Sequence, residues 1–352
     1  MQEEDGKAID PIPLDREVTV PGLFDPITIQ NLTLKNRIVM PPMATHMAEE
    51  DGAVLEKHIR HYAARAEAGV GLIMVEHAYI DRGGRAGETQ LGIHDDGCVQ
   101  GLRRLADAIR AAGAASGIQI THAGARTTRA IAGAQPVAPS AIVDPKSGEM
   151  PRTLTPDEMG SLAVAFAEAA GRAAAAGFDI VELHGAHGYL LGQFLSPLTN
   201  HRGDRYGGDL NGRLTFAREV IAAVRKTVGR HFPLFYRLGA DDLTPGGLRP
   251  EDGRRAAGLL ARAGIDVIDI SGGYGGTGRD RFPEQGFFVP LAEGVRQAAG
   301  IPVIGVGNIR EADYADRVVR EGRIDLVAVG RALLADPLWA RKAAKRLGVE
   351  TP

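Results

Sequence analysis

Two histidines and a tyrosine follow an apolar stretch near the middle of the chain. His184 and His187 lie three residues apart at the end of the run 178–183, and Tyr189 comes two residues later. This position predicts that the three side chains stand at the carboxyl end of a buried strand. Two imidazoles and a phenol can hydrogen-bond to one small polar group, such as a carbonyl oxygen that becomes negative during a reaction. A His-x-x-His pair by itself is more often structural or part of a metal site, so other residues must support this interpretation.

Further polar residues stand at the ends of other apolar runs. His46, His77 and His122 are isolated histidines, and a hydrogen-bonded structural role is the more common one for each. Gln119 ends a run, where a buried amide can satisfy the backbone or pair with the edge of a heterocycle. Arg237 lies within an apolar run, and a buried cation requires an anion or an electron-rich ligand beside it.

Glycines in the last third of the chain predict a phosphate site. Gly307 and Asn308 follow one apolar run, and Gly330 and Arg331 follow the next. Glycine lets backbone N–H groups approach an anion, and arginine adds a charged pair of donors. In barrels of alternating strands and helices, the loops after the seventh and eighth strands are the usual place for a phosphate.

A second glycine-rich stretch, 271–278, has a different interpretation. It lacks the strand–turn–helix context of a dinucleotide-binding fingerprint, so it does not predict a nucleotide site. We expect a mobile loop beside the active site instead, with Tyr274 lining the substrate pocket.

The elements that position these residues are repeated strand–helix units. Short apolar runs rich in β-branched residues alternate with amphipathic helical patterns. The runs span residues 37–43, 71–76, 116–121, 179–183, 233–238, 266–270, 302–306 and 325–329. This number of units predicts an α/β fold, a single-domain (β/α)8 TIM barrel, in which the carboxyl ends of all strands share one face.

The order of turns disfavours a doubly wound sheet. The first run leads into Pro41 and Pro42, where a doubly wound sheet would carry a glycine-rich turn. We expect residues 23–352 to form the barrel, which would bind the cofactor, and residues 1–22 to form a polar N-terminal extension. The segment before Asn36 is expected to cover the floor of the barrel or to pack alongside it.

Composition excludes several other classes of protein. The chain has 352 residues, a formal charge of −3 and 44% hydrophobic residues. A sequence pI near 6.4 does not indicate the excess of positive charge that binding to nucleic acid or to an anionic membrane requires. A single cysteine, Cys98, excludes an internal disulfide and any four-thiolate zinc or iron–sulfur site, and we expect no metal among the site residues. The polar N-terminus predicts neither a signal peptide nor an anchor, and hence a cytoplasmic protein.

Ordered motifs along nearly the whole chain resemble one family. They are 23–26 (LFDP), 34–38 (LKNRI), 41–43 (PPM), 117–124 (GIQITHAG), 182–190 (ELHGAHGYL), 195–200 (LSPLTN), 205–208 (RYGG) and 329–337 (VGRALLADP). In this order they resemble the old yellow enzymes, the NADH:flavin oxidoreductase family of FMN-containing barrels. The resemblance extends from about residue 23 to residue 347.

The resemblance implies a role for each matching position. Around the flavin it implies contacts from Pro42, Met43, Ala44, His77, Gln119 and Arg237, and around the phosphate from Gly307, Asn308, Gly330 and Arg331. His184 and His187 would bind the carbonyl oxygen of the substrate, and Tyr189 falls at the position of the proton donor. His46 and Tyr274 would line the substrate pocket. Ala44 departs from the cysteine or threonine of many relatives, and His46 from a tyrosine of some.

The activity that the resemblance implies is reduction of the C=C bond of an α,β-unsaturated carbonyl compound, with FMN as cofactor and NADPH or NADH as reductant. The expected partners are a small-molecule substrate and further copies of the chain in a homo-oligomer, and neither nucleic acid nor a membrane. An alternative is FMN-dependent oxidation, by N-demethylation or desaturation. A non-redox isomerase or aldolase is disfavoured because no lysine ends a strand, and a flavin-binding module without turnover remains a further alternative.

Overall fold

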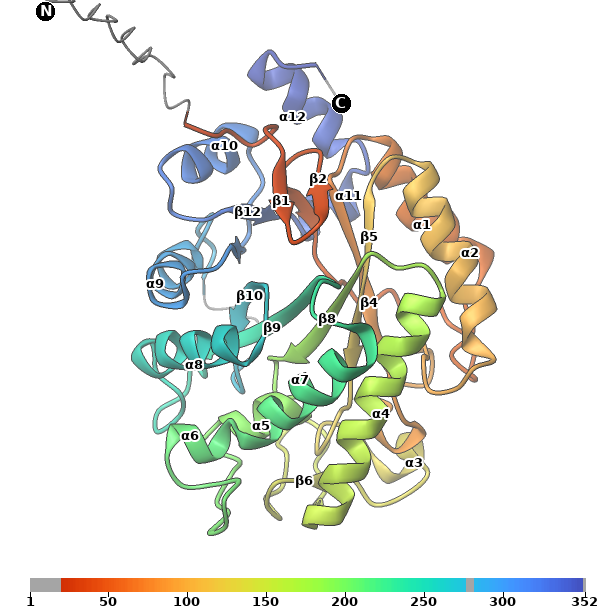
Figure 1. Cartoon of the computed structure of the whole chain (residues 1–352), viewed down its shortest axis with the longest axis vertical. Helices are drawn as coiled ribbons and strands as arrows, with labels where there is room; N and C mark the ends of the chain where they lie inside the picture. The colour runs from red at the N-terminus through yellow and green to blue at the C-terminus, as the bar shows by residue number, and fades with distance from the viewer. Residues whose placement is uncertain (1–19, 277–281, 351–352) are drawn as a thin grey trace, which may run out of the picture.

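Eight parallel strands close into a barrel in the computed structural model, which describes residues 20–276 and 282–350 (Figure 1). In the order in which they pair, the strands are β3 (Ile38–Met40), β4 (Leu72–Tyr79), β5 (Ala115–Thr121), β8 (Ile180–Gly185), β9 (Leu234–Asp241), β10 (Val267–Gly272), β11 (Val303–Gly305) and β12 (Leu326–Ala328). Strand β12 pairs with β3 and closes the ring. Each strand overlaps one of the eight predicted runs, so the predicted barrel is confirmed.

Helices follow the strands and surround the barrel. The principal ones are α1 (Glu56–Glu67), α2 (Cys98–Ala111), α4 (Pro156–Ala175), α7 (Thr215–Val228), α8 (Pro250–Ala263), α9 (Val289–Ala299), α10 (Ala312–Arg320) and α12 (Trp339–Leu347). Shorter elements lie in the connections: η1 (Arg82–Gly84), α3 (Arg129–Ala132), β6 (Val137–Ala138), β7 (Arg152–Thr153), α5 (Leu190–Leu195), α6 (Leu210–Arg213) and α11 (Arg331–Ala335). The apolar faces of the principal helices pack on the outside of the strands and form the larger core.

Helix α4 begins and ends as its sequence predicts. The Thr155 hydroxyl accepts a hydrogen bond from the backbone N–H of Glu158, and the Glu158 carboxylate accepts one from the backbone N–H of Thr155. Pro156 takes the first turn, where no N–H is needed. Gly177 follows the helix with φ of +88°, a conformation that glycine adopts without strain, and the chain then enters β8.

A hairpin of β1 (Ile27–Ile29) and β2 (Leu32–Leu34) covers the amino end of the barrel. Its buried residues Ile29 and Leu34 pack against side chains that point into the barrel, among them Phe235 of β9. For the hairpin, the first of the two expected positions, covering the floor of the barrel, is therefore confirmed. The boundary proposed at residue 22 remains a prediction, and residues 1–19 lie outside the described residues.

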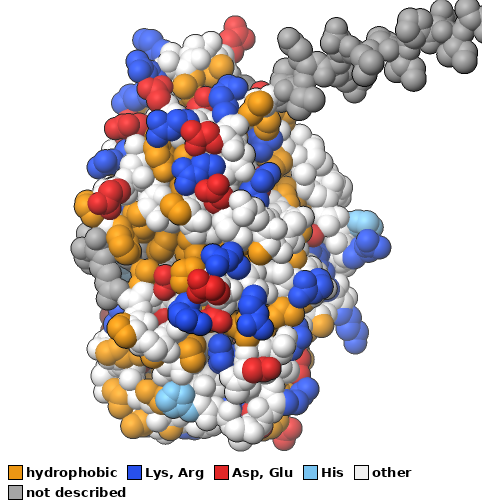
Figure 2. Space-filling view, turned by 90° about the vertical axis from the view of Figure 1, so that its left-hand side faces the viewer, with side chains coloured by type: hydrophobic (Ala, Val, Ile, Leu, Met, Phe, Trp, Pro, Cys, Tyr) orange, Lys and Arg blue, Asp and Glu red, His pale blue; other side chains and the backbone are white. Residues whose placement is uncertain are grey.

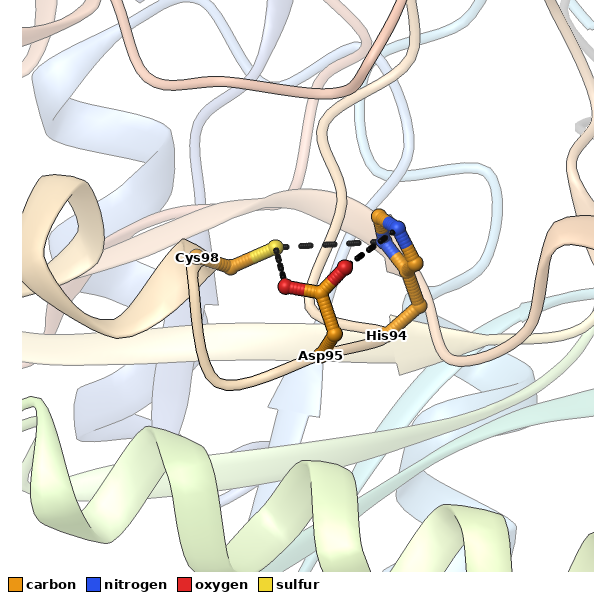
Figure 3. Close-up of side chains that lie close together, drawn as sticks. All are labelled: His94, Asp95 and Cys98. Carbon is orange, nitrogen blue, oxygen red and sulfur yellow. Dashed lines mark hydrogen bonds and ion pairs between the residues drawn. The ribbon is translucent and has the colours of Figure 1, made fainter.

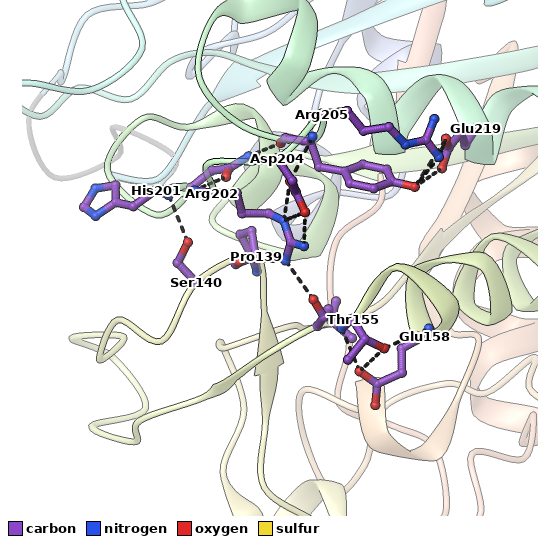
Figure 4. Close-up of polar contacts among 12 residues, drawn as sticks. Pro139, Ser140, Thr155, Glu158, His201, Arg202, Asp204, Arg205 and Glu219 are labelled. Carbon is purple, nitrogen blue, oxygen red and sulfur yellow. Dashed lines mark hydrogen bonds and ion pairs between the residues drawn. The ribbon is translucent and has the colours of Figure 1, made fainter.

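Loops at the carboxyl rim are braced by a polar network (Figure 4). The Arg202 guanidinium donates hydrogen bonds to the carbonyls of Pro139 and Leu154 at 3.2 and 2.7 Å and pairs with Asp204. The backbone N–H of His201 donates to the Ser140 hydroxyl at 2.9 Å. These contacts join the segment after β5 to the segment that follows α5.

Acidic and basic side chains are interspersed on the face of the molecule that Figure 2 shows, as the small net charge predicts. Among the described residues, no helix has the length and apolar character that crossing a membrane requires.

Candidate functional site

Strand register places three predicted polar residues in two neighbouring rows inside the barrel, with Gln119 in one row and His184 and Arg237 in the next. Gln119 of β5 pairs in register with Glu182 of β8, and His184 of β8 pairs with Arg237 of β9. Arg237 in turn pairs with Asp269 of β10. Because side chains alternate between the two faces of a strand, residues in register lie side by side on one face.

The two histidines of the site, His184 and His187, contact each other beside the row that holds His184 and Arg237. His184 Nδ1 accepts a hydrogen bond from the backbone N–H of Ala186 at 3.3 Å, so its ring carries its proton on Nε2. That Nε2 lies 3.3 Å from His187 Nδ1, and His187 Nε2 lies 2.6 Å from the Ser271 hydroxyl. Two ring nitrogens so close together can both reach one acceptor atom.

Both imidazoles are neutral at pH 7. Burial lowers the pKa of His184 and of His187 well below the ordinary value, and the nearby Arg237 guanidinium lowers both further. A neutral imidazole can donate one hydrogen bond and accept another, and it adds no charge to a buried site.

Tyr189 lies against the same rings. Its ring centroid is 4.7 Å from that of His184 and 5.4 Å from that of His77. Burial raises the pKa of Tyr189, and Arg126 opposes the shift, so the phenol is protonated at pH 7. The predicted trio of His184, His187 and Tyr189 is therefore brought together, with His77 beside it.

His77 and His122 have hydrogen-bond partners of their own. His77 Nδ1 lies 2.7 Å from Gln90 Nε2, and burial lowers the pKa of His77 to about 4. His122 Nδ1 accepts from the backbone N–H of Gly124 at 3.0 Å, and burial lowers the pKa of His122 to about 4. The structural role expected of His122 agrees with these contacts.

Arg237 lies between two buried carboxyl groups that the sequence analysis did not select. Its Nε lies 3.5 Å from Asp269 Oδ2, and Glu182 Oε1 accepts a hydrogen bond from Gln119 Nε2 at 2.8 Å. Burial raises the pKa of Asp269 to about 6 and that of Glu182 well above its ordinary value, while Arg237 opposes both shifts. The sequence did contain a signal for these residues: Glu182 and Asp269 each stand within an apolar run, and a buried carboxyl group requires a partner.

A cavity of about 220 Å³ joins the predicted flavin and phosphate residues. Its lining comprises Met43, Arg237, Gly307, Asn308, Gly330 and Arg331 of the predicted set, together with Pro41, Ser271, Phe287, Phe288, Val306, Ile309 and Ala328. Gly307 has φ of +125°, and a Cβ atom built there would lie 2.8 Å from the backbone nitrogen of Phe288. The backbone at this wall therefore leaves no space for a side chain at residue 307.

These residues fit a flavin mononucleotide. Gln119 Oε1 and Arg237 Nε are buried and have no hydrogen-bond partner among the described residues. Such atoms are costly unless a ligand satisfies them, and the polar edge of an isoalloxazine carries matching donors and acceptors. Glycine backbone and Arg331 at the other end of the cavity supply donors of the kind that bind phosphate.

The rim residues lie at the mouth of the site. Ala44 and His46 are exposed, and Pro42 before them is buried. Tyr274 is half-buried, with its ring 5.2 Å from the Arg126 guanidinium carbon. The predicted mobile loop 271–278 continues beyond residue 276, and its last two residues lie outside the described residues.

Sequence reasoning missed two residues that hold the histidine pair. Ser271 is the residue before the last of β10 and contacts His187 Nε2. Its identity as a small hydroxyl residue near the carboxyl end of a strand was the only signal in the sequence. Arg126 donates to the backbone carbonyl of His187 and pairs with Asp144 at 2.8 Å. His187 itself has φ of +57°, an uncommon conformation that these contacts hold in place.

Comparisons with known proteins agree with this geometry. Residues 22–350 match the model of the NADH:flavin oxidoreductase / NADH oxidase family. The chain is 46% identical to an NADH oxidase of Thermoanaerobacter brockii over 330 residues, which cover 92% of this chain and 50% of that protein. It is 44% identical to an NADPH dehydrogenase of Geobacillus thermodenitrificans, covering 93% of this chain and 95% of the relative.

Solved structures give the same result. The old yellow enzyme homologue from Zymomonas mobilis is 29% identical, with a TM-score of 0.82 and coverage of 94% of both chains. The chain thus spans the length of some relatives and about half of the T. brockii protein.

Proposed function

Because the chain belongs to the NADH:flavin oxidoreductase / NADH oxidase family, we propose that it reduces the activated C=C bond of small α,β-unsaturated carbonyl compounds with NADPH or NADH. When bound, FMN takes a hydride from the nicotinamide and supplies it to the β-carbon of the substrate. The observation that carries the proposal is the contact of His184, His187 and Tyr189 at the barrel mouth.

In this proposal the polar side chains of Gln119 and Arg237 inside the barrel hold one end of the cofactor. Gln119 would accept from the pyrimidine edge through Oε1, and Arg237 would donate to the neighbouring acceptor atoms. Gln119 Oε1 and Arg237 Nε are buried and have no hydrogen-bond partner among the described residues. The positive charge of Arg237 would also favour an anionic reduced flavin. Gly307, Asn308, Gly330 and Arg331 would bind the phosphate at the other end of the cavity. Pro42, Met43 and Ala44 would line the ring system.

The histidine pair would bind the carbonyl oxygen of the substrate. As hydride adds to the β-carbon, negative charge grows on that oxygen, and donors fixed in place stabilise it. His184 already offers its Nε2–H. In the structure that N–H lies 3.3 Å from His187 Nδ1, within hydrogen-bond distance. When a substrate oxygen replaces this contact, the Ser271 hydroxyl would donate to His187 Nε2, the His187 proton would sit on Nδ1, and both N–H groups would donate to the one oxygen.

Tyr189 would deliver the proton that completes the reaction. Its phenol lies beside His184 and is held in the protonated form by burial, which suits a general acid that works near neutral pH. His46 and Tyr274 at the rim would contact the rest of the substrate.

The test is an anaerobic experiment on the two half-reactions. The purified protein should carry FMN, NADPH or NADH should bleach it, and a cyclic enone should then restore the oxidised spectrum with formation of the saturated ketone. N-methylated amines serve as the arm for the alternative, FMN-dependent oxidation. Bleaching by an amine without NAD(P)H, together with no reoxidation by enones, would replace the proposal with that alternative.

A further inference from the structure

A second group of ligating side chains lies away from the flavin cavity, before helix α2. His94 and Asp95 stand in the loop that leads to the helix, and Cys98 is its first residue. Figure 3 shows the three side chains pointing toward one another. Each offers one ligand atom, and these atoms all lie within 4.8 Å of one another.

The sulfur contacts in this group have about the spacing of ligands to one ion: Cys98 Sγ lies 3.8 Å from His94 Nδ1 and 3.8 Å from Asp95 Oδ1. His94 Nε2 lies 3.0 Å from Asp95 Oδ2, yet it is buried and has no hydrogen-bond partner among the described residues. The nitrogen and the oxygen are therefore close without being aligned as donor and acceptor. Because one imidazole binds an ion through a single nitrogen, Nδ1, which faces the Cys98 sulfur, is the ligand atom of His94, and Nε2 stays beside Asp95 Oδ2.

The surrounding fold holds each group in place. The His94 side chain is only 8% exposed, and its ring stacks on Tyr79 with centroids 4.8 Å apart. Asp95 Oδ1 accepts a hydrogen bond from the backbone N–H of Gly97 at 2.8 Å, which holds this oxygen beside the Cys98 sulfur and leaves it a second lone pair for an ion. Cys98 Sγ lies 3.8 Å from His94 Nδ1.

We propose that His94, Asp95 and Cys98 form a binding site for Zn²⁺. Thiolate, imidazole and carboxylate are the ligands that zinc takes, and three protein ligands leave a fourth tetrahedral position open. All three residues line a cavity of about 490 Å³, where water or a small anion can complete the coordination. Zinc ligands lie roughly 3–4 Å apart, so closing the site needs only small side-chain rotations, and the Asp95 side chain is 57% exposed and free to make them.

Charges near the cluster do not oppose a cation strongly. Arg172 pairs with Asp96 at 2.8 Å and with Glu168 at 3.6 Å, and Arg104 pairs with Glu56 at 2.6 Å. Arg82 and Arg172 both contribute a positive field at His94. Asp81 and Asp95 contribute the opposite field at the same ring.

The experiment titrates the flavin-loaded protein with Co²⁺ as a coloured substitute for Zn²⁺. Difference spectra should show the d–d bands of four-coordinate Co²⁺, which lie to the red of flavin absorption, together with a sulfur-to-cobalt charge-transfer band. One equivalent of Zn²⁺ should abolish both. His94→Gln and Cys98→Ser should each weaken binding at least tenfold. Asp96→Asn removes the same charge as Asp95→Asn one residue further along and should bind as the wild type does, whereas Asp95→Asn should not.

A second measurement needs no variant. Cys98 is the only cysteine of the chain, so the rate of its modification by a thiol reagent reports on this position alone. Zn²⁺ at one equivalent should slow that modification at least tenfold. Unchanged thiol reactivity, or a six-coordinate Co²⁺ spectrum without the sulfur band, would overturn the proposal.

Discussion

At the residue scale, the reaction depends on donors that stay neutral until the substrate oxygen becomes negative. We expect the double variant His184→Ala/His187→Ala to keep FMN, because neither ring lines the cavity that joins the flavin and phosphate residues. Enone reduction should fall by a factor of about 10²–10³ or more, the usual loss for one such donor, while reduction by NADPH changes less. Stopped-flow measurement of both half-reactions checks this. The variant His231→Ala, at an exposed histidine in the connection between α7 and β9, is the control. Enone turnover that survives in the double variant would show that another group binds the oxygen.

Tyr189 is tested by separating proton delivery from hydride delivery. Tyr189→Phe should slow reoxidation by an enone by a factor of about 10²–10⁴ and leave reduction by NADPH unchanged. Because burial raises the pKa of Tyr189 above 10.0, the wild-type phenol stays protonated from pH 6 to 9, and the proton is lost only as pH rises past the raised pKa. The reoxidation rate should therefore not fall across that interval for want of this proton. Equal slowing of both half-reactions in the variant would contradict a role in proton delivery.

Residue types in the sequence predicted this trio, but not the groups that hold it. His184, His187 and Tyr189 lie within one short stretch, so one motif carries all three. Ser271 and Asp269 come from another strand about 85 residues later, and they meet β8 and β9 only through strand register and loop geometry. A single sequence does not specify that register.

At the element scale, two arginines in the segment that follows α5 test how much the polar contacts of these loops stabilise the fold (Figure 4). Arg202 has a side chain 8% exposed and donates to two backbone carbonyls, whereas Arg205 is 67% exposed and pairs with Glu219. Arg202→Ala leaves those carbonyls without their donor and should lower the free energy of unfolding by about 2–4 kcal/mol. Arg205→Ala should change the unfolding midpoint little, because exposed ion pairs contribute little. Urea unfolding of both variants measures this, and equal losses would contradict the assignment.

Backbone geometry at the end of β11 gives a second test at this scale. Gly307 has φ of +125° and no space for a Cβ, while Gly300 has φ of +67° and open space around it. Gly307→Ala should weaken FMN binding at least tenfold, because relief of the clash moves the backbone that lines the cavity. Gly300→Ala carries only the conformational strain, about 1 kcal/mol, and should bind FMN normally. Fluorescence titration of the two apoproteins with FMN measures the Kd of each. A loss of affinity in Gly307→Ala alone would show that the steric clash, and not the backbone strain, weakens binding.

The ends of elements were predicted less well than their existence. The first strand was expected at 37–43 but covers only Ile38–Met40, because the chain reaches Pro41 and Pro42, which have no N–H for a ladder. Strand β9 extends three residues beyond its predicted end, to Asp241, since its neighbours continue the hydrogen-bond ladder. The pairing of neighbouring strands sets where each strand begins and ends. The pattern of apolar residues in the sequence does not specify that pairing.

At the scale of the whole molecule, counting units predicted the closed barrel, whereas the pairing that closes it is visible only in the structure. Val327 of β12 pairs with Ile38 of β3, residues from opposite ends of the chain. Closure brings the last two loops, with Gly307 and Gly330, next to Met43 after the first strand, and this makes one continuous cavity.

A ligand that spans this cavity should stabilise the whole barrel, and the phosphate should contribute separately from the ring system. At a free FMN concentration of 100 times Kd, binding adds about 2.7 kcal/mol, which corresponds to a rise in Tm of roughly 4 °C for a chain of this size. Riboflavin, which lacks the phosphate, should raise Tm less at the same concentration. Arg331→Ala should reduce the difference between the two ligands, because the arginine meets only the phosphate, and Arg255→Ala, at an exposed arginine on α8, should leave it unchanged. If FMN and riboflavin stabilise the wild type equally, the loops after β11 and β12 do not bind a phosphate.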